Sequence, residues 1–185
     1  INNPFITATG GTITTSGDYK IHTFTSPGTF CVSNAGNPAG STQVDYMVVA
    51  GGAGGGGDNG CASGSGSGGG AGGFRESHST PVSGCYTASP LATPTALPVS
   101  VQGYPITVGA GGTGGCVNNP GGSGANSIFS TITSAGGGGG TRFNRSNPAK
   151  AGGSGGGATM NNGSGCSTGG SGNTPPVSPP QGSNG

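Results

Sequence analysis

Long glycine tracts constrain the fold of this chain more than any other feature of its sequence. Three tracts directly follow a short run of residues typical of a β-strand, at 44–49, 104–108 and 128–133. Ordering a glycine costs more backbone entropy than ordering any other residue, so a folded tract needs many backbone partners. We interpret a strand followed by glycines as the repeating unit of the chain.

Bundled extended helices would give glycine tracts those partners. Without Cβ atoms, helices of about three residues per turn can lie side by side and exchange N–H···O and Cα–H···O bonds. No stretch shows apolar residues at α-helical spacing. We therefore expect a mainly β fold of short antiparallel strands plus bundled polyglycine-II helices, with essentially no α-helix. The alternative is a low-complexity chain without fixed structure, which the low charge and the strand-like runs oppose.

The N-terminal part reads as a β-meander. The runs 12–15, 19–24 and 29–32 alternate apolar and polar residues, and Ser16-Gly17-Asp18 and Ser26-Pro27-Gly28 separate them with turn residues. The sequence thus predicts a β-rich segment over 1–50, a glycine-rich region over 51–172 and a Pro-rich linker over 173–185. Within the glycine-rich region, residues 74–98 and 141–150 are expected to be exposed loops.

The composition argues against several classes of function. Only 5% of the residues are charged, and the chain has two histidines. General acid–base catalysis needs titratable groups within hydrogen-bond reach of one another, so we expect no enzymatic activity, no cofactor and no metal. Binding of nucleic acid needs clustered Lys and Arg, and the formal net charge here is +1. No run approaches the roughly 20 apolar residues of a membrane span.

Two motifs match catalytic or cofactor patterns by composition alone. The stretch 152–156 fits the GxSxG pattern, and several tracts fit GxGxxG. Neither lies between a clear strand and a helix, which is the context that both patterns require. We assign no function to them.

The two expected loops hold the candidate contact residues. Arginine and aromatic side chains can stack on sugars or pair with carboxylates and phosphates, and loops on a rigid scaffold are where binding residues concentrate. The alternative for both loops is a solvated segment with weak ion pairs. The candidates for receptor contact are Arg75, Glu76, His78, Tyr86, Arg142, Phe143 and Arg145.

The chain has an odd number of cysteines, spread without metal-binding spacing. Disulfides would suit a scaffold with a small core, and two bridges would leave one thiol free or bonded to another chain. Fully reduced thiols are the open alternative. The candidate disulfide residues are Cys31, Cys61, Cys85, Cys116 and Cys166. The chain starts at Ile1, and we expect it to be a processed or partial product.

Several longer motifs resemble glycine-rich virion proteins of tailed bacteriophages, particularly phages of aquatic bacteria. They occupy 3–11, 19–25, 44–52, 72–77, 98–109 and 172–182, and so span nearly the whole chain. Such proteins are usually regarded as components of tail fibres or fibre tips. More distantly, the sequence is similar to T-even-type adhesins, which pack polyglycine-II helices and present variable loops to receptors.

The resemblance implies a virion or extracellular location, a bacterial surface glycan or protein as partner, and association with other fibre subunits, as a homo-oligomer. It supplies no catalytic residues. Two alternatives remain open from the sequence. One is a self-assembling filament subunit that recognises no receptor, and the other is an ice-binding protein with a regular Thr- or Ala-bearing face.

Overall fold

The computed structural model describes residues 3–58, 66–78, 89, 91–117, 119–143, 148–161 and 165–185. These residues form strands and extended segments, and none of them lies in a helix. None of the described segments could therefore cross a membrane as a helix. The mainly β prediction is confirmed. The chain divides into two compact units, of which unit 1 holds 1–47, 76–108 and 128–132, and unit 2 holds 48–75, 109–127 and 133–185.

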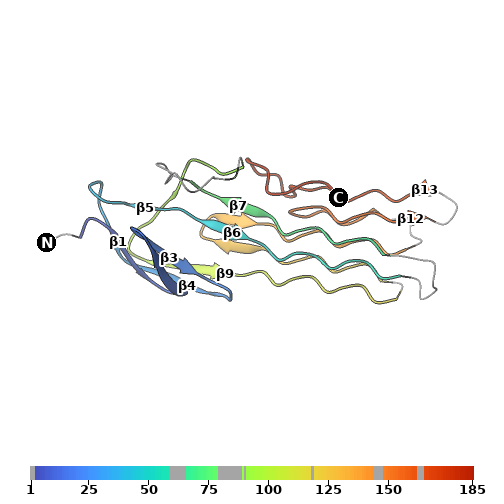
Figure 1. The fold of residues 1–185 in the computed structure, drawn as a ribbon, viewed down its shortest axis with the longest axis horizontal. Helices are drawn as coiled ribbons and strands as arrows, with labels where there is room; N and C mark the ends of the chain where they lie inside the picture. The colour runs from blue at the N-terminus through green and yellow to red at the C-terminus, as the bar shows by residue number, and fades with distance from the viewer. Residues whose placement is uncertain are drawn as a thin grey trace. The chain divides into compact units, whose positions relative to one another are not determined.

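The largest sheet has the strand order β1-β4-β9-β10-β11 (Figure 1). In this sheet β1 pairs with β4, β4 with β9 and β9 with β10, in each case antiparallel. Two-stranded sheets join β2 to β3, β5 to β8, β6 to β7 and β12 to β13. The bounds are β1 Ile6–Thr9, β2 Thr12–Ser16, β3 Tyr19–Thr23, β4 Gly28–Ala35, β5 Gln43–Val44, β6 Met47–Val49, β7 Phe74–Glu76, β8 Leu97–Pro98, β9 Gly103–Thr107, β10 Ser127–Phe129, β11 Ile132–Ser134, β12 Met160–Asn161 and β13 Gly165–Cys166.

The hydrophobic core of unit 1 is small and aromatic. Phe30 packs edge-on against Phe129, with ring centroids 5.9 Å apart, and Tyr104 contacts both rings. The Tyr104 hydroxyl accepts a hydrogen bond from the amide of Ser100 (2.8 Å). Hydrogen bonds from the Gln102 side chain, and then from Ser100, hold the pKa of Tyr104 below its usual value. The buried members of this core are Ala8, Phe30, Val32, Val99 and Tyr104.

The expected meander is wrong in its pairing. Strands β2 and β3 do form a hairpin across Gly17 and Asp18, as predicted. Strand β4, however, pairs with β1 and β9 instead of continuing from β3. The reason lies in burial, because Phe30 and Val32 of β4 are core residues whereas β2 and β3 are exposed along almost their whole length.

The chain crosses between the units at strands. It leaves unit 1 within β6, directly after β9 and within β11, and it returns within β7 and β10. Each departure enters a glycine tract, so the repeat of strand followed by glycine is present in the structure. The predicted division at residue 50 nevertheless differs from the structure, because 76–108 and 128–132 fold together with the N-terminal segment.

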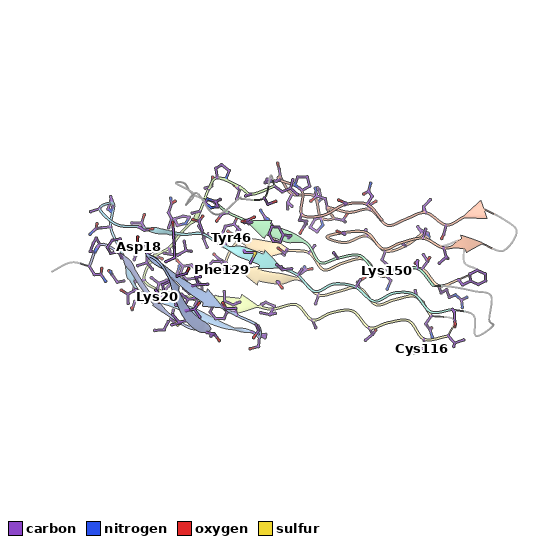
Figure 2. All side chains as sticks on the ribbon, viewed as in Figure 1. Asp18, Lys20, Tyr46, Cys116, Phe129 and Lys150 are labelled. Carbon is purple, nitrogen blue, oxygen red and sulfur yellow. The ribbon has the colours of Figure 1, made fainter. Side chains whose placement is uncertain are left out.

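Unit 2 is built from extended glycine-rich segments, which we call rows: 50–57, 66–73, 109–116, 119–126, 135–143, 148–153, 154–159 and 167–173. Their traces run side by side in Figure 1, and few side chains project from them in Figure 2. Backbone hydrogen bonds join neighbouring rows at every third residue. For row 50–57, the amides of Ala50, Ala53 and Gly56 donate to the carbonyls of Gly73, Gly70 and Ser67.

Other faces of the same row repeat this spacing. The amides of Gly51, Gly54 and Gly57 donate to row 119–126, at Ala125, Gly122 and Asn119. The carbonyls of those three glycines accept from row 135–143, at Gly137, Gly140 and Phe143. A three-residue spacing is that of a helix with about three residues per turn. It supports polyglycine-II helices, which remain a prediction.

Glycine content follows the number of surrounding rows. Residues 135–141 are all buried, and they contain the uninterrupted run 136–140. A Cβ atom on any of these five glycines would overlap the backbone of another row. Row 109–116 instead has exposed positions, and it carries Ala110, Thr113 and Cys116 at every third residue. A row that other rows cover on more of its sides therefore contains more glycine.

The C-terminal segment is not a free spacer. Residues 173–185 belong to unit 2, and the Gln181 side chain is only 3% exposed. Its Oε1 accepts from the amide of Ala135 (2.7 Å), and its Nε2 donates to the carbonyl of Pro175 (2.9 Å). The predicted Pro-rich linker is thus corrected, because the bonds of Gln181 fold the segment back onto the glycine rows.

Candidate functional site

Several rows of unit 2 end level with one another, and these ends form the candidate site. The amide of Gly57 donates to the carbonyl of Asn119 (2.8 Å), and the carbonyl of Gly57 accepts from the amide of Phe143 (3.3 Å). The amide of Asn119 in turn donates to the carbonyl of Cys116 (2.9 Å). We call these ends the row-end surface, and its described members are Asp58, Cys116, Val117, Asn119, Arg142 and Phe143.

A cluster of hydroxyl groups supports the row-end surface. The Ser67 Oγ donates to the carbonyl of Thr141 (3.0 Å), and the hydroxyls of Thr141 and Thr159 lie 3.1 Å apart. The Thr159 Oγ1 donates to the carbonyl of Arg142 (3.0 Å), which ties that residue to the row beside it. The Ser167 Oγ donates to the carbonyl of Thr159 (2.8 Å). These hydroxyls replace glycine where a side chain can satisfy a buried carbonyl.

The sequence reasoning missed this cluster. Its members interrupt glycine tracts, and a Ser or Thr in such a tract looks like any other small residue. The available signal was position, because Thr141 directly follows the longest glycine run and Thr159 comes shortly after the glycine run 155–157.

Arg142 and Phe143 are the predicted contact residues that the structure places on the row-end surface. Both are partly exposed, and both directly follow the buried residues 135–141, whose backbone is hydrogen-bonded to several other rows. Val117 is 55% exposed at the same end of the rows. The third predicted member, Arg145, lies outside the described residues. The arrangement presents an aromatic ring and a guanidinium group on a fixed backbone.

Of the other predicted contact residues, Arg75 belongs to unit 2 and lies away from the row-end surface. Arg75 follows row 66–73 at its Gly73 end, and Gly73 bonds to Ala135, whereas Ser67 at the opposite end bonds to Thr141, next to Arg142. The expected loop over 74–98 begins with strand β7 and ends with β8, which corrects that boundary. Glu76 is 7% exposed and His78 is half-buried, while Tyr86 lies outside the described residues.

Residues around Glu76 form a separate backbone-tied segment of unit 1. The Ser77 Oγ donates to the Asp45 carboxylate (2.9 Å) and accepts from the amide of Tyr46 (3.0 Å). The amide of Thr93 donates to the carbonyl of Glu76 (3.0 Å), and the amide of His78 donates to the carbonyl of Thr93 (2.8 Å). The polar groups at this place hold three segments of the chain together.

Comparison with known proteins gives a family assignment. Residues 25–185 match the family model described as a glycine-rich domain. The chain belongs to this glycine-rich domain family. No curated protein and no solved structure matches it. The match begins before β4 and continues to the C-terminus, so it covers the five-stranded sheet from β4 onward and all the glycine rows.

The disulfide prediction is wrong for two cysteines of this glycine-rich domain. Cys31 and Cys116 are free and exposed. Cys31 lies in β4 of unit 1, and Cys116 lies at a row end of unit 2. Cys61 and Cys85 lie outside the described residues, and of Cys166 only the backbone, in β13, is described. Bridges among these three stay a prediction.

Titratable groups are sparse on the described surface. Among the residues that the structure describes, no three His, Cys, Asp or Glu side chains gather closely enough to hold a metal ion. On the row-end surface the charged members are Asp58 and Arg142, and both make interactions with other groups. The row-end surface can therefore bind a partner by aromatic stacking, hydrogen bonding and ion pairing.

Proposed function

We propose that this glycine-rich domain is a non-enzymatic module of a virion appendage, of the tail-fibre or adhesin kind, that attaches to a bacterial surface. The observation that carries the proposal is the pair Arg142 and Phe143 at the end of a row bonded through Gly57 to its neighbours. Binding residues concentrate on loops that a rigid scaffold positions. The motif resemblance to phage virion proteins supplies the bacterial target.

The chemistry of this pair favours a surface glycan or an acidic protein patch. A phenylalanine ring offers an apolar face on which a sugar ring can stack, and a guanidinium pairs with carboxylate or phosphate in a forked geometry. The bond from Thr159 to the Arg142 carbonyl fixes the backbone beside the ring (3.0 Å). Fixing the backbone before binding lowers the entropy lost when a receptor is held.

The test is binding of the labelled chain to a panel of bacterial strains, aquatic isolates included. We expect binding to a subset of strains, and a loss of at least about tenfold in affinity for the double variant Arg142→Ala, Phe143→Ala, which corresponds to roughly 1.4 kcal/mol. The chain offers a matched control, because Tyr19 and Lys20 are also an adjacent aromatic and cation, and both are exposed. The variant Tyr19→Ala, Lys20→Ala should bind as the parent does.

Two outcomes would contradict the proposal. If binding is lost in the Tyr19 and Lys20 variant but kept in the Arg142 and Phe143 variant, the contact surface is in unit 1. If the folded chain binds no strain, the alternative of a filament subunit without receptor binding replaces attachment. Unfolding curves of each variant show whether a loss reflects contact or folding.

A further inference from the structure

Row 109–116 is an edge row of unit 2. The amides of Gly112 and Gly115 donate to row 50–57, and the carbonyls of Ala110 and Thr113 accept from row 119–126. The remaining sides of the row are exposed at 110–111, 113–114 and 116–117. Within the described part of the chain, the amides of Gly111 and Gly114 have no hydrogen-bond partner. An edge of this kind is a template for pairing with another backbone, as the edge of a β-sheet is.

The fold itself does not require glycine at two positions of this row. A Cβ atom at Gly114 would meet nothing within 4 Å, and one at Gly111 would come no closer than 3.6 Å to another atom. At Gly112 a Cβ would overlap the carbonyl of Gly122. An exposed glycine without a left-handed φ destabilises a chain relative to alanine, through the entropy of the unfolded state. Glycine at 111 and 114 therefore leaves the backbone of this edge row open to a second backbone.

The occupant must offer donors and acceptors at the same three-residue spacing, without Cβ atoms in the way. The rows of this chain have that pattern, and each bonds to its neighbours through it. Row 109–116 carries no charged side chain that would select an ionic partner. We propose that the same row of a second copy of this chain docks here, antiparallel, so that both copies use one self-complementary surface. The proposal does not depend on receptor binding.

The test is the mass of the chain in solution across a range of concentrations, measured both with and without a reductant. We expect the mass to rise from 17.1 kDa toward twice that value. The variant Gly114→Val should weaken association at least about tenfold while leaving thermal unfolding of the monomer unchanged or raised, since the monomer has room for the side chain. Gly68→Val is the matched control, because Gly68 lies on row 66–73 and its Cβ would also meet nothing within 4 Å.

Hydrogen exchange gives a second measurement of the same contact. The amides of Gly111 and Gly114 should exchange more slowly as the concentration rises, whereas the amide of exposed Gly68 should not change. Three results would overturn the proposal: a monomer at every concentration, association that the reductant abolishes, or association that Gly114→Val leaves intact. Thermal hysteresis of such a monomer would make ice the occupant. The reductant result would identify a disulfide through an exposed cysteine instead.

Discussion

Glycine residues of this chain differ in what surrounds the position that a Cβ atom would occupy. A Cβ at Gly54 would overlap the carbonyl of Thr113 on the neighbouring row. A Cβ at Gly52, two residues earlier, would come no closer than 3.9 Å to any neighbour. Both residues lie in the same tract and are indistinguishable in the sequence, so only the packing separates them.

This difference gives a matched pair of variants. Gly54→Ala should lower the free energy of unfolding by about 1–3 kcal/mol or more, because rows must move apart to admit the methyl group. Gly52→Ala should be neutral or stabilise by about 0.4–1 kcal/mol, because it reduces the entropy of the unfolded chain. Denaturant unfolding measures both. Equal effects of the two substitutions would contradict the packing of row 50–57.

The Gln181 side chain provides a hydrogen-bond acceptor for a buried amide of row 135–143. Its Oε1 accepts from the buried amide of Ala135 (2.7 Å), and the backbone carbonyl of Gln181 accepts from the amide of Phe74 (2.9 Å). The substitution Gln181→Ala would leave the Ala135 amide without its acceptor. A buried donor left unpaired costs about 1–3 kcal/mol.

We therefore expect Gln181→Ala to lower the unfolding free energy by that amount, and Gln43→Ala, at an exposed position of β5, to change it by less than about 0.5 kcal/mol. Thermal or denaturant unfolding of the two variants checks this. A Gln181→Ala variant as stable as the parent would mean that 173–185 does not pack on unit 2 in solution.

At the scale of elements, the β2–β3 hairpin is fixed by its turn. Ser16 pairs with Tyr19, so Gly17 and Asp18 form a two-residue loop, and Gly17 has a φ of 56°. Glycine at the first central position is typical of a type II′ turn, whose twist matches that of the two strands. A Cβ at Gly17 would meet nothing within 4 Å, so the demand for glycine there is conformational and not steric.

Gly17→Ala should destabilise the hairpin by about 1 kcal/mol, because alanine rarely adopts a left-handed φ. Amides of β2 and β3 should then exchange roughly fivefold faster, while amides of β4 stay unchanged. Gly17→Asn should have a smaller effect, since asparagine tolerates this conformation. Equal exchange in all three proteins would show that the turn does not fix the hairpin.

The elements that the sequence predicted correctly are those with a local signal. The run 104–108 contains an aromatic residue and β-branched residues, and it forms β9. The run 128–133 was expected as a single strand, but it forms two strands, β10 and β11, on either side of Ser130 and Thr131. Strand β1 was missed because Ile6–Thr9 is short and mostly Thr and Ala. The predicted meander was wrong because the pairing of β4 buries Phe30 and Val32 in the core. The strand that makes this possible, β9, is far away in the chain.

At the scale of the whole molecule, the sequence predicted that the glycine tracts would need many partners but not which tracts would be neighbours. The partners of Gly57, for example, are Asn119 and Phe143, and no feature of a glycine tract specifies either. The same limit applied to the candidate site. Arg142 and Phe143 were predicted from their residue types, but their place at a common row end follows from the register of hydrogen bonds between rows.

Site-resolved amide exchange over 50–57 measures whether hydrogen bonds join the rows at every third residue. The structure gives every amide of this row a backbone acceptor except those of Gly52 and Gly55, among the residues it describes. We expect two slow amides followed by one fast amide, repeated along the row, with Gly52 and Gly55 fast. Uniformly fast exchange would contradict an ordered row, and alternation at every second residue would replace the three-residue arrangement with an ordinary β-strand.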